Sequence, residues 1–186
     1  SHNLASILAL QQGGLAIWGA VAGGIFVTFI YARINKINVA KLFDVMVPGL
    51  LIAQIIGRIA CIINGDAYGD PTSLPWGFIY IHPGAIIPDY LKGIPTHPYP
   101  VYEMIWNGIS LLLLMSLRKR FKNDGTLFVA YLIVYSIGRF LLTFVRQEII
   151  WAFGLQEAQL ISILILVISL IALYLLKRKP HTKTVL

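Results

Sequence analysis

The chain has 186 residues, of which 58% are hydrophobic and only 12% are charged, and its mean hydropathy is +0.77. Soluble domains carry roughly 45–50% apolar and about 25% charged residues, so this composition excludes an ordinary soluble protein and predicts an all-α integral membrane protein. The net charge of +7 does not indicate nucleic-acid binding, because most of the 15 Lys and Arg residues lie in three short clusters beside apolar segments. The single cysteine excludes an intrachain disulfide and a multi-cysteine metal site.

Five apolar segments follow a short polar or interfacial stretch at residues 1–12. Each has 17 to 21 residues, about the length that the hydrocarbon core of a bilayer requires. We therefore expect a bundle of about five transmembrane helices that forms a single domain over residues 1–186. The expected spans are residues 14–32, 43–63, 101–117, 126–145 and 158–176.

The basic clusters predict the orientation of these spans. They lie at residues 33–41, 118–122 and 177–179, after the first, third and fifth spans, and therefore all on the same side of the membrane. By the positive-inside rule this side is cytoplasmic. We expect a multi-pass protein of a bacterial plasma membrane whose C-terminus is cytoplasmic.

Two connections lie on the opposite, extracytoplasmic side. Residues 70–99 form a long connection that is rich in Pro and Gly, and connections of this length usually carry function or cover a site. Its aromatic and aliphatic residues suggest that it lies on the bilayer surface. Residues 146–157 are expected to form a short loop.

The unusual polar residues gather on this extracytoplasmic side. The richest stretch runs from Gly57 to Gly69, where an arginine, an asparagine and an aspartate follow a nearly pure hydrocarbon run. Ionisable residues within membrane segments are costly and are rarely left without a partner or a task. The ends of spans two, three and four supply Arg58, Asn64 and Asp66, then His97, Tyr102 and Glu103, and finally Arg139, Arg146 and Gln147.

Arginine presents a planar fork of donors that suits phosphate and carboxylate groups. Several arginines with few acidic residues beside them predict a pocket for an anionic headgroup. The alternative is a structural ion-pair network of Arg139 with Glu103 and Arg58 with Asp66 that only ties helices together, and both interpretations can hold at once. His97 is a weaker candidate, since a histidine in a loop is often only a surface residue, and Cys61 is better interpreted as a small buried hydrophobe than as a nucleophile.

Four segments of the chain resemble motifs of the bacterial prolipoprotein diacylglyceryl transferases. They are the glycine-rich segment 14–23, the Gly-Arg to Asn-Gly-Asp-Ala-Tyr-Gly segment 57–69, the His-Pro to Tyr-Glu segment 97–103, and the Arg-Phe to Arg-Gln segment 138–147. The motifs occur in the family's order and the resemblance covers essentially the whole chain.

The resemblance implies an enzyme that moves a diacylglyceryl group from phosphatidylglycerol to the lipobox cysteine of a prolipoprotein. A thioether forms, glycerol phosphate leaves, and neither a cofactor nor a metal is implied. The partners would be phosphatidylglycerol, the prolipoprotein signal peptide with its lipobox, and the lipid bilayer, with no nucleic acid. The implied catalytic residues are Arg139, Asp66, His97 and Glu103, and the implied substrate-binding residues are Arg58, Asn64, Gly69, Tyr102 and Arg146.

The chain departs from the family pattern at several positions. Trp18 stands where many members carry His, so a base at this position is excluded. Ala60-Cys61 replaces a frequent Gly-Asn, and Asp66 and Thr143 each stand where Glu is frequent. By this resemblance, we expect that the family's usual first one or two spans, with a functional Tyr, are not in this chain. These departures favour the alternative of a non-catalytic, lipid-binding structural subunit of a membrane complex.

A transporter or channel is the third interpretation. The charged residues of this chain cluster at one membrane face rather than at the midplane, and no inverted repeat is evident. Both features argue against transport.

Overall fold

The computed structural model describes residues 14–146, 150–152 and 154–178, and the side chains of residues 14–18 and 150–152 are not among the features described. The predicted interfacial segment at residues 1–12 and the candidate Gln147 lie outside the described residues. The chain divides into two compact units, residues 1–43 and 44–186. The prediction of a single domain stays a prediction.

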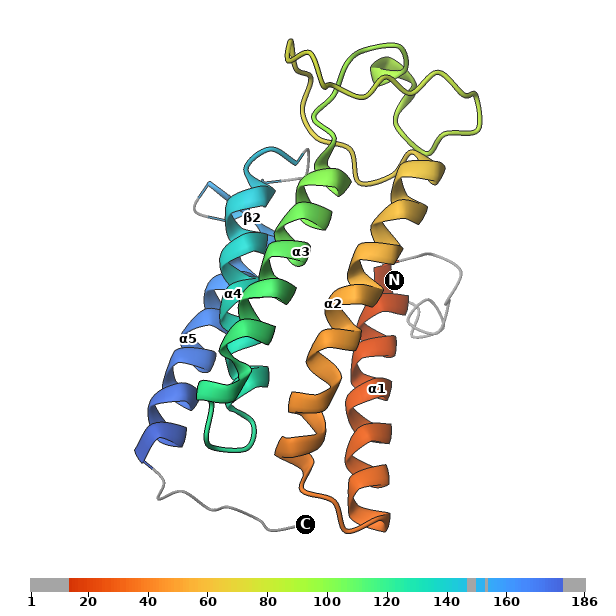
Figure 1. Cartoon of the computed structure of the whole chain (residues 1–186). Helices are drawn as coiled ribbons and strands as arrows, with labels where there is room; N and C mark the ends of the chain where they lie inside the picture. Colours follow the sequence, from red (N-terminus) through yellow and green to blue (C-terminus); the bar gives the residue numbers. More distant parts are fainter. Residues whose placement is uncertain (1–13, 147–149, 153, 179–186) are drawn as a thin grey trace. The chain divides into compact units, whose positions relative to one another are not determined.

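Long helices dominate the chain, in agreement with the predicted all-α membrane fold. The five are α1 (Gly14–Ile34), α2 (Val39–Asn64), α3 (Tyr99–Leu117), α4 (Thr126–Thr143) and α5 (Glu157–Arg178) (Figure 1). The last four are long and apolar enough to cross a membrane, and the apolar part of α1 whose side chains are described, residues 19–34, is shorter. Within the described residues, the structure thus confirms the five predicted helices near their predicted bounds, and four of them meet the length for a span.

The loop predicted for residues 146–157 contains a small hairpin instead. Strand β1 (Ile150–Ala152) pairs antiparallel with β2 (Leu155–Gln156), and α5 follows directly. Gly154 lies in the turn with a φ of +74°, a left-handed conformation that glycine adopts without strain. Sequence reasoning missed this hairpin because strands of two or three residues are too short to show a periodic pattern.

The interior of the second unit is a narrow apolar seam between helices. Val47 and Leu51 from α2, Leu114 from α3 and Tyr131 from α4 are buried together. Most other large apolar side chains point outward, as Leu112 on α3 does with 71% of its surface exposed. Outward-facing aliphatic residues are typical of helices surrounded by lipid rather than water.

Close packing of α3 on α4 depends on one glycine. The Trp106 indole of α3 donates a hydrogen bond to the Val134 carbonyl of α4 at 3.1 Å. A Cβ atom built on Gly138 would lie 2.0 Å from the indole nitrogen, so any larger residue would force the helices apart. Small residues at helix contacts allow such close approach in membranes.

At the end of the unit opposite the long connection, side chains from distant helices satisfy helix termini. The carboxylate of Asp44 in α2 accepts hydrogen bonds from the Gly125 and Phe128 backbone N–H groups, each at 2.7 Å, at the start of α4. Asn123 donates to the Leu176 carbonyl near the end of α5 at 2.6 Å. These bonds replace the backbone partners that helix ends lack.

The long connection begins at Gly65, where α2 has ended, and its one helical turn is η3 (Asp89–Leu91). It joins the end of α2 to the start of α3 (Figure 1). The Gly69 N–H donates to the His97 carbonyl at 3.1 Å, and the Asp70 N–H donates to the Val145 carbonyl at 3.0 Å. Because a Cβ on Gly69 would lie 2.5 Å from the Val145 oxygen, only glycine lets these three segments cross so closely.

Candidate active site

The end of α2 turns sharply and returns its polar residues toward the bundle. Gly65 has a φ of +67°, and the Asp66 N–H donates to the Cys61 carbonyl at 3.1 Å, the bond pattern of a glycine-terminated helix. A Cβ on Gly65 would lie 2.8 Å from the Ala85 Cβ, so glycine is required by space as well as by conformation. The turn leaves Arg58 in the second-last turn of α2 and Asp66 beside Cys61.

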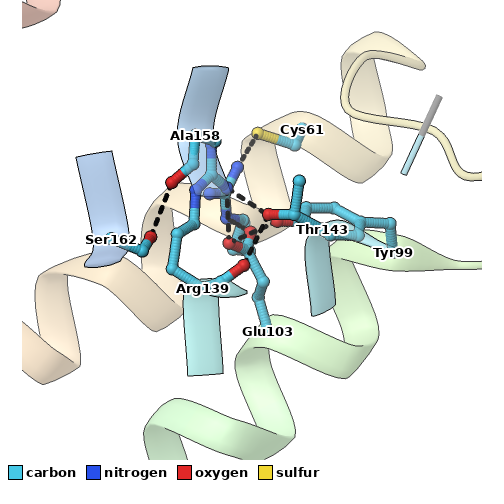
Figure 2. A network of polar contacts seen from close by, with 8 residues as sticks. Cys61, Tyr99, Glu103, Arg139, Thr143, Ala158 and Ser162 are labelled. Atoms are coloured by element: carbon cyan, nitrogen blue, oxygen red, sulfur yellow. Dashed lines mark hydrogen bonds and ion pairs between the residues drawn. The ribbon is translucent and has the colours of Figure 1, made fainter. Parts of the chain in front are cut away.

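Glu103 is the centre of the site. Its Oε1 accepts a hydrogen bond from the Arg139 guanidinium at 2.9 Å, and its Oε2 forms an ion pair with Arg58 Nε. The Glu103 side chain is only 8% exposed, while those of Arg58 and Arg139 are 25% and 19% exposed. Figure 2 shows Glu103 and Arg139 pointing toward each other, with Cys61 close by. The three charged groups come from α3, α2 and α4.

The predicted ion pairs are partly right. The pair between Arg139 and Glu103 is confirmed. Arg58 forms its ion pair with Glu103 rather than with Asp66, so that part of the predicted network is wrong. The reason is geometric: Asp66 follows the glycine turn, while Glu103 lies on the face of α3 that is turned toward α2.

Tyr99 completes the cluster, although sequence reasoning did not single it out. Its side chain is fully buried, its hydroxyl donates to Glu103 Oε1 at 2.9 Å, and it accepts a bond from Arg139 at 2.6 Å. The Arg146 guanidinium lies 5.2 Å from the centroid of the Tyr99 ring, a cation–π contact that links Arg146 to the cluster. The available signal was its spacing of four residues from Glu103, which places both on one helix face.

The cluster carries surplus positive charge. Two guanidinium groups share the single carboxylate of Glu103, so the three residues together keep a formal charge of about +1. Arg146 adds a further positive charge beside Tyr99. If each arginine had its own carboxylate, the positive charges would be neutralised. One shared carboxylate neutralises only one of them. The arrangement therefore favours an anion.

A pocket of about 250 Å³ opens next to the cluster. Arg58 and Glu103 form its charged wall, and Arg139 is not among the lining residues. The full lining is Gln54, Gly57, Arg58, Cys61, Glu103, Asn107 and Tyr135. A ligand in this pocket would contact the guanidinium of Arg58 directly. Arg139 would act on it from behind Glu103, without direct contact.

Asp66 and Cys61 lie at the edge of the site. The Arg58 guanidinium contacts the Cys61 sulfur at 3.6 Å, and the thiol also interacts with the Asp66 carboxylate. The Asp66 Oδ1 atom is buried without a hydrogen-bond partner among the described residues. Burial and the nearby charge of Asp66 raise the pKa of Tyr80 in the connection, so this phenol stays neutral and adds no charge to the site.

His97 and Tyr102 form a separate polar group. The Tyr102 hydroxyl lies 3.2 Å from His97 Nδ1 and accepts a hydrogen bond from the Trp76 indole at 2.9 Å. Neighbouring residues on a helix point about 100° apart, so Tyr102 and Glu103 serve different groups. His97 and Tyr102 thus contact each other and Trp76, a residue that sequence reasoning did not place at the site.

The remaining predicted residues have more local contacts. The Asn64 carbonyl accepts a bond from the Ile86 N–H at 3.0 Å, and its side chain is exposed rather than joined to the arginines. Gly69 provides the close crossing described above. Thr143 is fully buried, and its hydroxyl bonds to the Arg139 carbonyl within α4 (Figure 2). The side chain of Trp18 lies outside the described features.

Within residues 14–146, 150–152 and 154–178, no group of three or more His, Cys, Asp or Glu side chains is placed to hold a metal ion. The expectation that the chain needs no metal and no cofactor stays a prediction. The polar groups of the site instead offer guanidinium donors and neutral amides.

Apolar helices of membrane-spanning length and a pocket lined by Arg58 and Glu103 define a helical membrane protein with a charged pocket. The family model for prolipoprotein diacylglyceryl transferase matches residues 1–175, and the chain belongs to this family. The predicted resemblance to this family is thereby confirmed.

Curated relatives carry the same description. The chain is 36% identical to the phosphatidylglycerol–prolipoprotein diacylglyceryl transferase of Clostridioides difficile over 97% of its own length and 69% of the relative. It is 35% identical to the enzyme of that name from Acaryochloris marina, and 37% identical to the one from Lysinibacillus sphaericus. Each of these two matches covers 98% of this chain and 69% of the relative.

Proposed function

We propose that the chain transfers a diacylglyceryl group from phosphatidylglycerol to the lipobox cysteine thiol of a prolipoprotein. The observation that carries this proposal is the meeting of Arg58 and Arg139, from two separate helices, on one shared carboxylate beside a pocket. The names of the relatives support the substrates, and the surplus charge of the site suits a phosphate.

In this reaction the main task of the protein is to stabilise the charges that develop. The thiol sulfur forms a bond to a glycerol carbon of the lipid while the bond from that carbon to the phosphate oxygen breaks. Glycerol phosphate leaves with the electron pair, and the thiol proton passes to an acceptor. Guanidinium groups placed where negative charge develops lower the barrier of such a step. A thiol reacts as its thiolate, which a positive field also favours.

Each residue of the cluster has a distinct proposed role. Arg58 lines the pocket and binds the lipid phosphate, and Arg139 stabilises the departing charge. Glu103 and Tyr99 act as positioning residues, because their bonds hold the two guanidinium groups at a fixed separation. Asp66 and Asn64 orient the headgroup at the end of α2.

His97, Tyr102, Gly69 and Arg146 have supporting roles in this proposal. His97 and Tyr102 hold the connection through Trp76, and Gly69 joins the connection to the end of α4. Arg146 adds charge beside Tyr99. Their effect on transfer would come from the shape of the site rather than from direct contact with the reacting atoms.

We place this site at the extracytoplasmic face of a bacterial plasma membrane, with the C-terminus in the cytoplasm. The basic residues at 118–122, 177 and 178 support this orientation, because they lie at the ends of α3 and α5 that are away from the long connection. Both substrates reside in the membrane, so they would reach the pocket sideways between helices.

The test is thioether formation on a lipobox peptide in vesicles that contain phosphatidylglycerol. Replacing Arg58 or Arg139 by Ala removes one charge-stabilising group and is expected to slow transfer by about 10²–10³-fold, as the loss of an oxyanion-stabilising donor does in other enzymes. Arg120→Ala is the matched control, since Arg120 is exposed at the opposite end of α3 and should leave the rate unchanged.

Full activity of both alanine variants would overturn the proposal. Absence of product with the unaltered chain, together with stable association with other membrane proteins, would favour the alternative of a lipid-binding structural subunit. The names of the relatives speak for the enzyme.

A further inference from the structure

A second layer of polar residues lies one helical turn below the charged cluster. Gln54 precedes Arg58 by four residues on α2, Asn107 follows Glu103 by four residues on α3, and Tyr135 precedes Arg139 by four residues on α4. Since α3 runs opposite to its two neighbours (Figure 1), all three steps lead away from the long connection and deeper into the bundle. All three deeper residues line the same pocket as Arg58 and Glu103.

Asn107 is the strongest sign that this layer binds something. Its side chain is only 6% exposed, it lines the pocket, and its amide makes no hydrogen bond with another described residue. An amide that lines a pocket within the membrane needs hydrogen-bond partners, because few water molecules reach that depth. Asn107 can find such a partner in a ligand that enters the pocket.

Gln54 shows the same shortage of partners. Its Nε2 donates to the Tyr131 hydroxyl at 2.7 Å, but its Oε1 is buried without a hydrogen-bond partner. The bond to Tyr131 holds this amide in place at the pocket wall. Asn107, Gln54 and Tyr135 together offer donors and acceptors but no charge.

The depth of this layer identifies the part of a lipid that it fits. In a bilayer the phosphate lies nearer the water, and the ester-linked glycerol backbone follows within a few ångströms toward the hydrocarbon. One turn of helix covers about 5.4 Å, which matches this step from charged to neutral polar groups. A second charged group would find no counter-charge here, whereas ester carbonyl oxygens are uncharged acceptors that an amide can satisfy.

We propose that Asn107, supported by Gln54 and Tyr135, forms a subsite for the ester-linked glycerol backbone of the donor lipid, in which the Asn107 amide donates to an ester carbonyl. This inference rests on the proposed function, because it assumes that the lipid phosphate lies at Arg58. It adds a residue that recognises the uncharged glycerol backbone of the lipid. The pocket of about 250 Å³ is far larger than the ~30 Å³ that one water molecule occupies in the liquid.

The test compares two lipids that differ only at the proposed contact. Dioleoyl phosphatidylglycerol carries two ester carbonyls, and its dialkyl ether counterpart carries none. Binding of each lipid to the detergent-solubilised chain is measured by displacement of a fluorescent phosphatidylglycerol. The unaltered chain is expected to bind the diester about threefold to tenfold more tightly, the value of one hydrogen bond to a neutral group.

Asn107→Leu removes the donor while nearly preserving side-chain volume. It should weaken diester binding by the same about threefold to tenfold and leave diether binding unchanged, so that the preference disappears. Asn107→Ala is the second variant, in case the leucine variant does not fold. Its smaller side chain cannot overfill the pocket, and it should lose the preference for the diester as well. Ser110→Ala is the matched control, because Ser110 is buried on α3 but bonds to its own helix and does not line the pocket.

Equal binding of the two lipids by the unaltered chain would overturn the subsite, as would a preference that survives in both Asn107 variants. In either case the space would hold water only. Failure of the proposed transferase function appears separately, as absence of thioether product in the vesicle assay. The binding comparison decides the subsite whether or not product forms.

Discussion

Two carboxylates on the helices of the larger unit have opposite surroundings. Asp44, near the start of α2, gives both oxygens to the backbone N–H groups of Gly125 and Phe128. Glu103, near the start of α3, gives both oxygens to guanidinium groups. Asp44 thus meets neutral donors at a helix N-terminus, whereas Glu103 meets two full positive charges beside a pocket.

The difference separates a structural acid from a functional one. At Asp44 the donors are backbone groups that any helix start must satisfy, and the positive end of the α4 dipole stabilises the carboxylate. At Glu103 one negative charge holds two positive ones, so charge remains for a ligand. The partners of a membrane-embedded acid, more than its burial, therefore indicate its role.

Glu103→Gln tests the charged side of this comparison and should have the largest effect. Breaking a buried ion pair costs about 3–5 kcal/mol, and here two guanidinium groups would lose their shared partner. We expect a lower free energy of unfolding and a strong loss of transfer, measured by denaturant titration and by the vesicle assay. Glu103→Asp keeps the charge and should recover part of both, and an unchanged transfer rate in Glu103→Gln would contradict the positioning role.

Tyr99→Phe removes one hydroxyl and leaves the ring beneath Arg146. The lost bonds involve charged partners, which are worth about 1.5–3 kcal/mol each, so transfer should fall by tenfold or more through kcat. The KM for phosphatidylglycerol should change little, because the hydroxyl does not line the pocket. Ser110→Ala is the control, because it removes a buried hydroxyl that bonds to its own helix, and an equal loss of transfer there would show that any buried hydroxyl matters.

Asp44→Asn tests the structural side. The amide keeps one acceptor oxygen but loses the charge at the α4 terminus, for an expected cost of about 1–2 kcal/mol in stability. The transfer rate of the folded protein should be unchanged. A fall in kcat without a fall in thermal midpoint would remove the distinction between the two carboxylates.

Asp89→Asn should have the smallest effect. Asp89 forms an exposed ion pair with Lys92 at 2.7 Å, and this pair lowers the pKa of the carboxyl group. A lowered pKa gives a contribution that is present above the ordinary pKa of Asp and is lost as the pH falls through the folded value. Exposed ion pairs contribute little to stability, so we expect the unaltered chain and Asp89→Asn to have indistinguishable thermal midpoints at pH 7. A clearly lower thermal midpoint of the variant would contradict this.

The sequence predicted the membrane helices well because each is a property of one continuous segment. The spans predicted at residues 43–63 and 101–117 were found as α2 and α3, each extended by a few residues. The pair of Arg139 with Glu103 was also predictable, since both are isolated charges that orientation places at one face. The site was therefore visible in outline from residues 57–147.

The remaining features depend on geometry that a linear pattern does not contain. Arg58 pairs with Glu103 instead of the nearer Asp66 because the turn at Gly65 redirects the chain. Asp44 meets α4 across more than eighty positions of sequence, so no local motif marks it. Asn107 is an ordinary polar residue until the pocket around it is known.

The crossing at Gly69 has a mechanical consequence. Backbone hydrogen bonds join the start of the connection to His97 at its other end and to Val145 just after α4. The two ends of the connection therefore cannot separate without breaking these bonds. Under the proposed function, a prolipoprotein would then reach the pocket from the side of the bundle, between helices, while these backbone bonds stay intact.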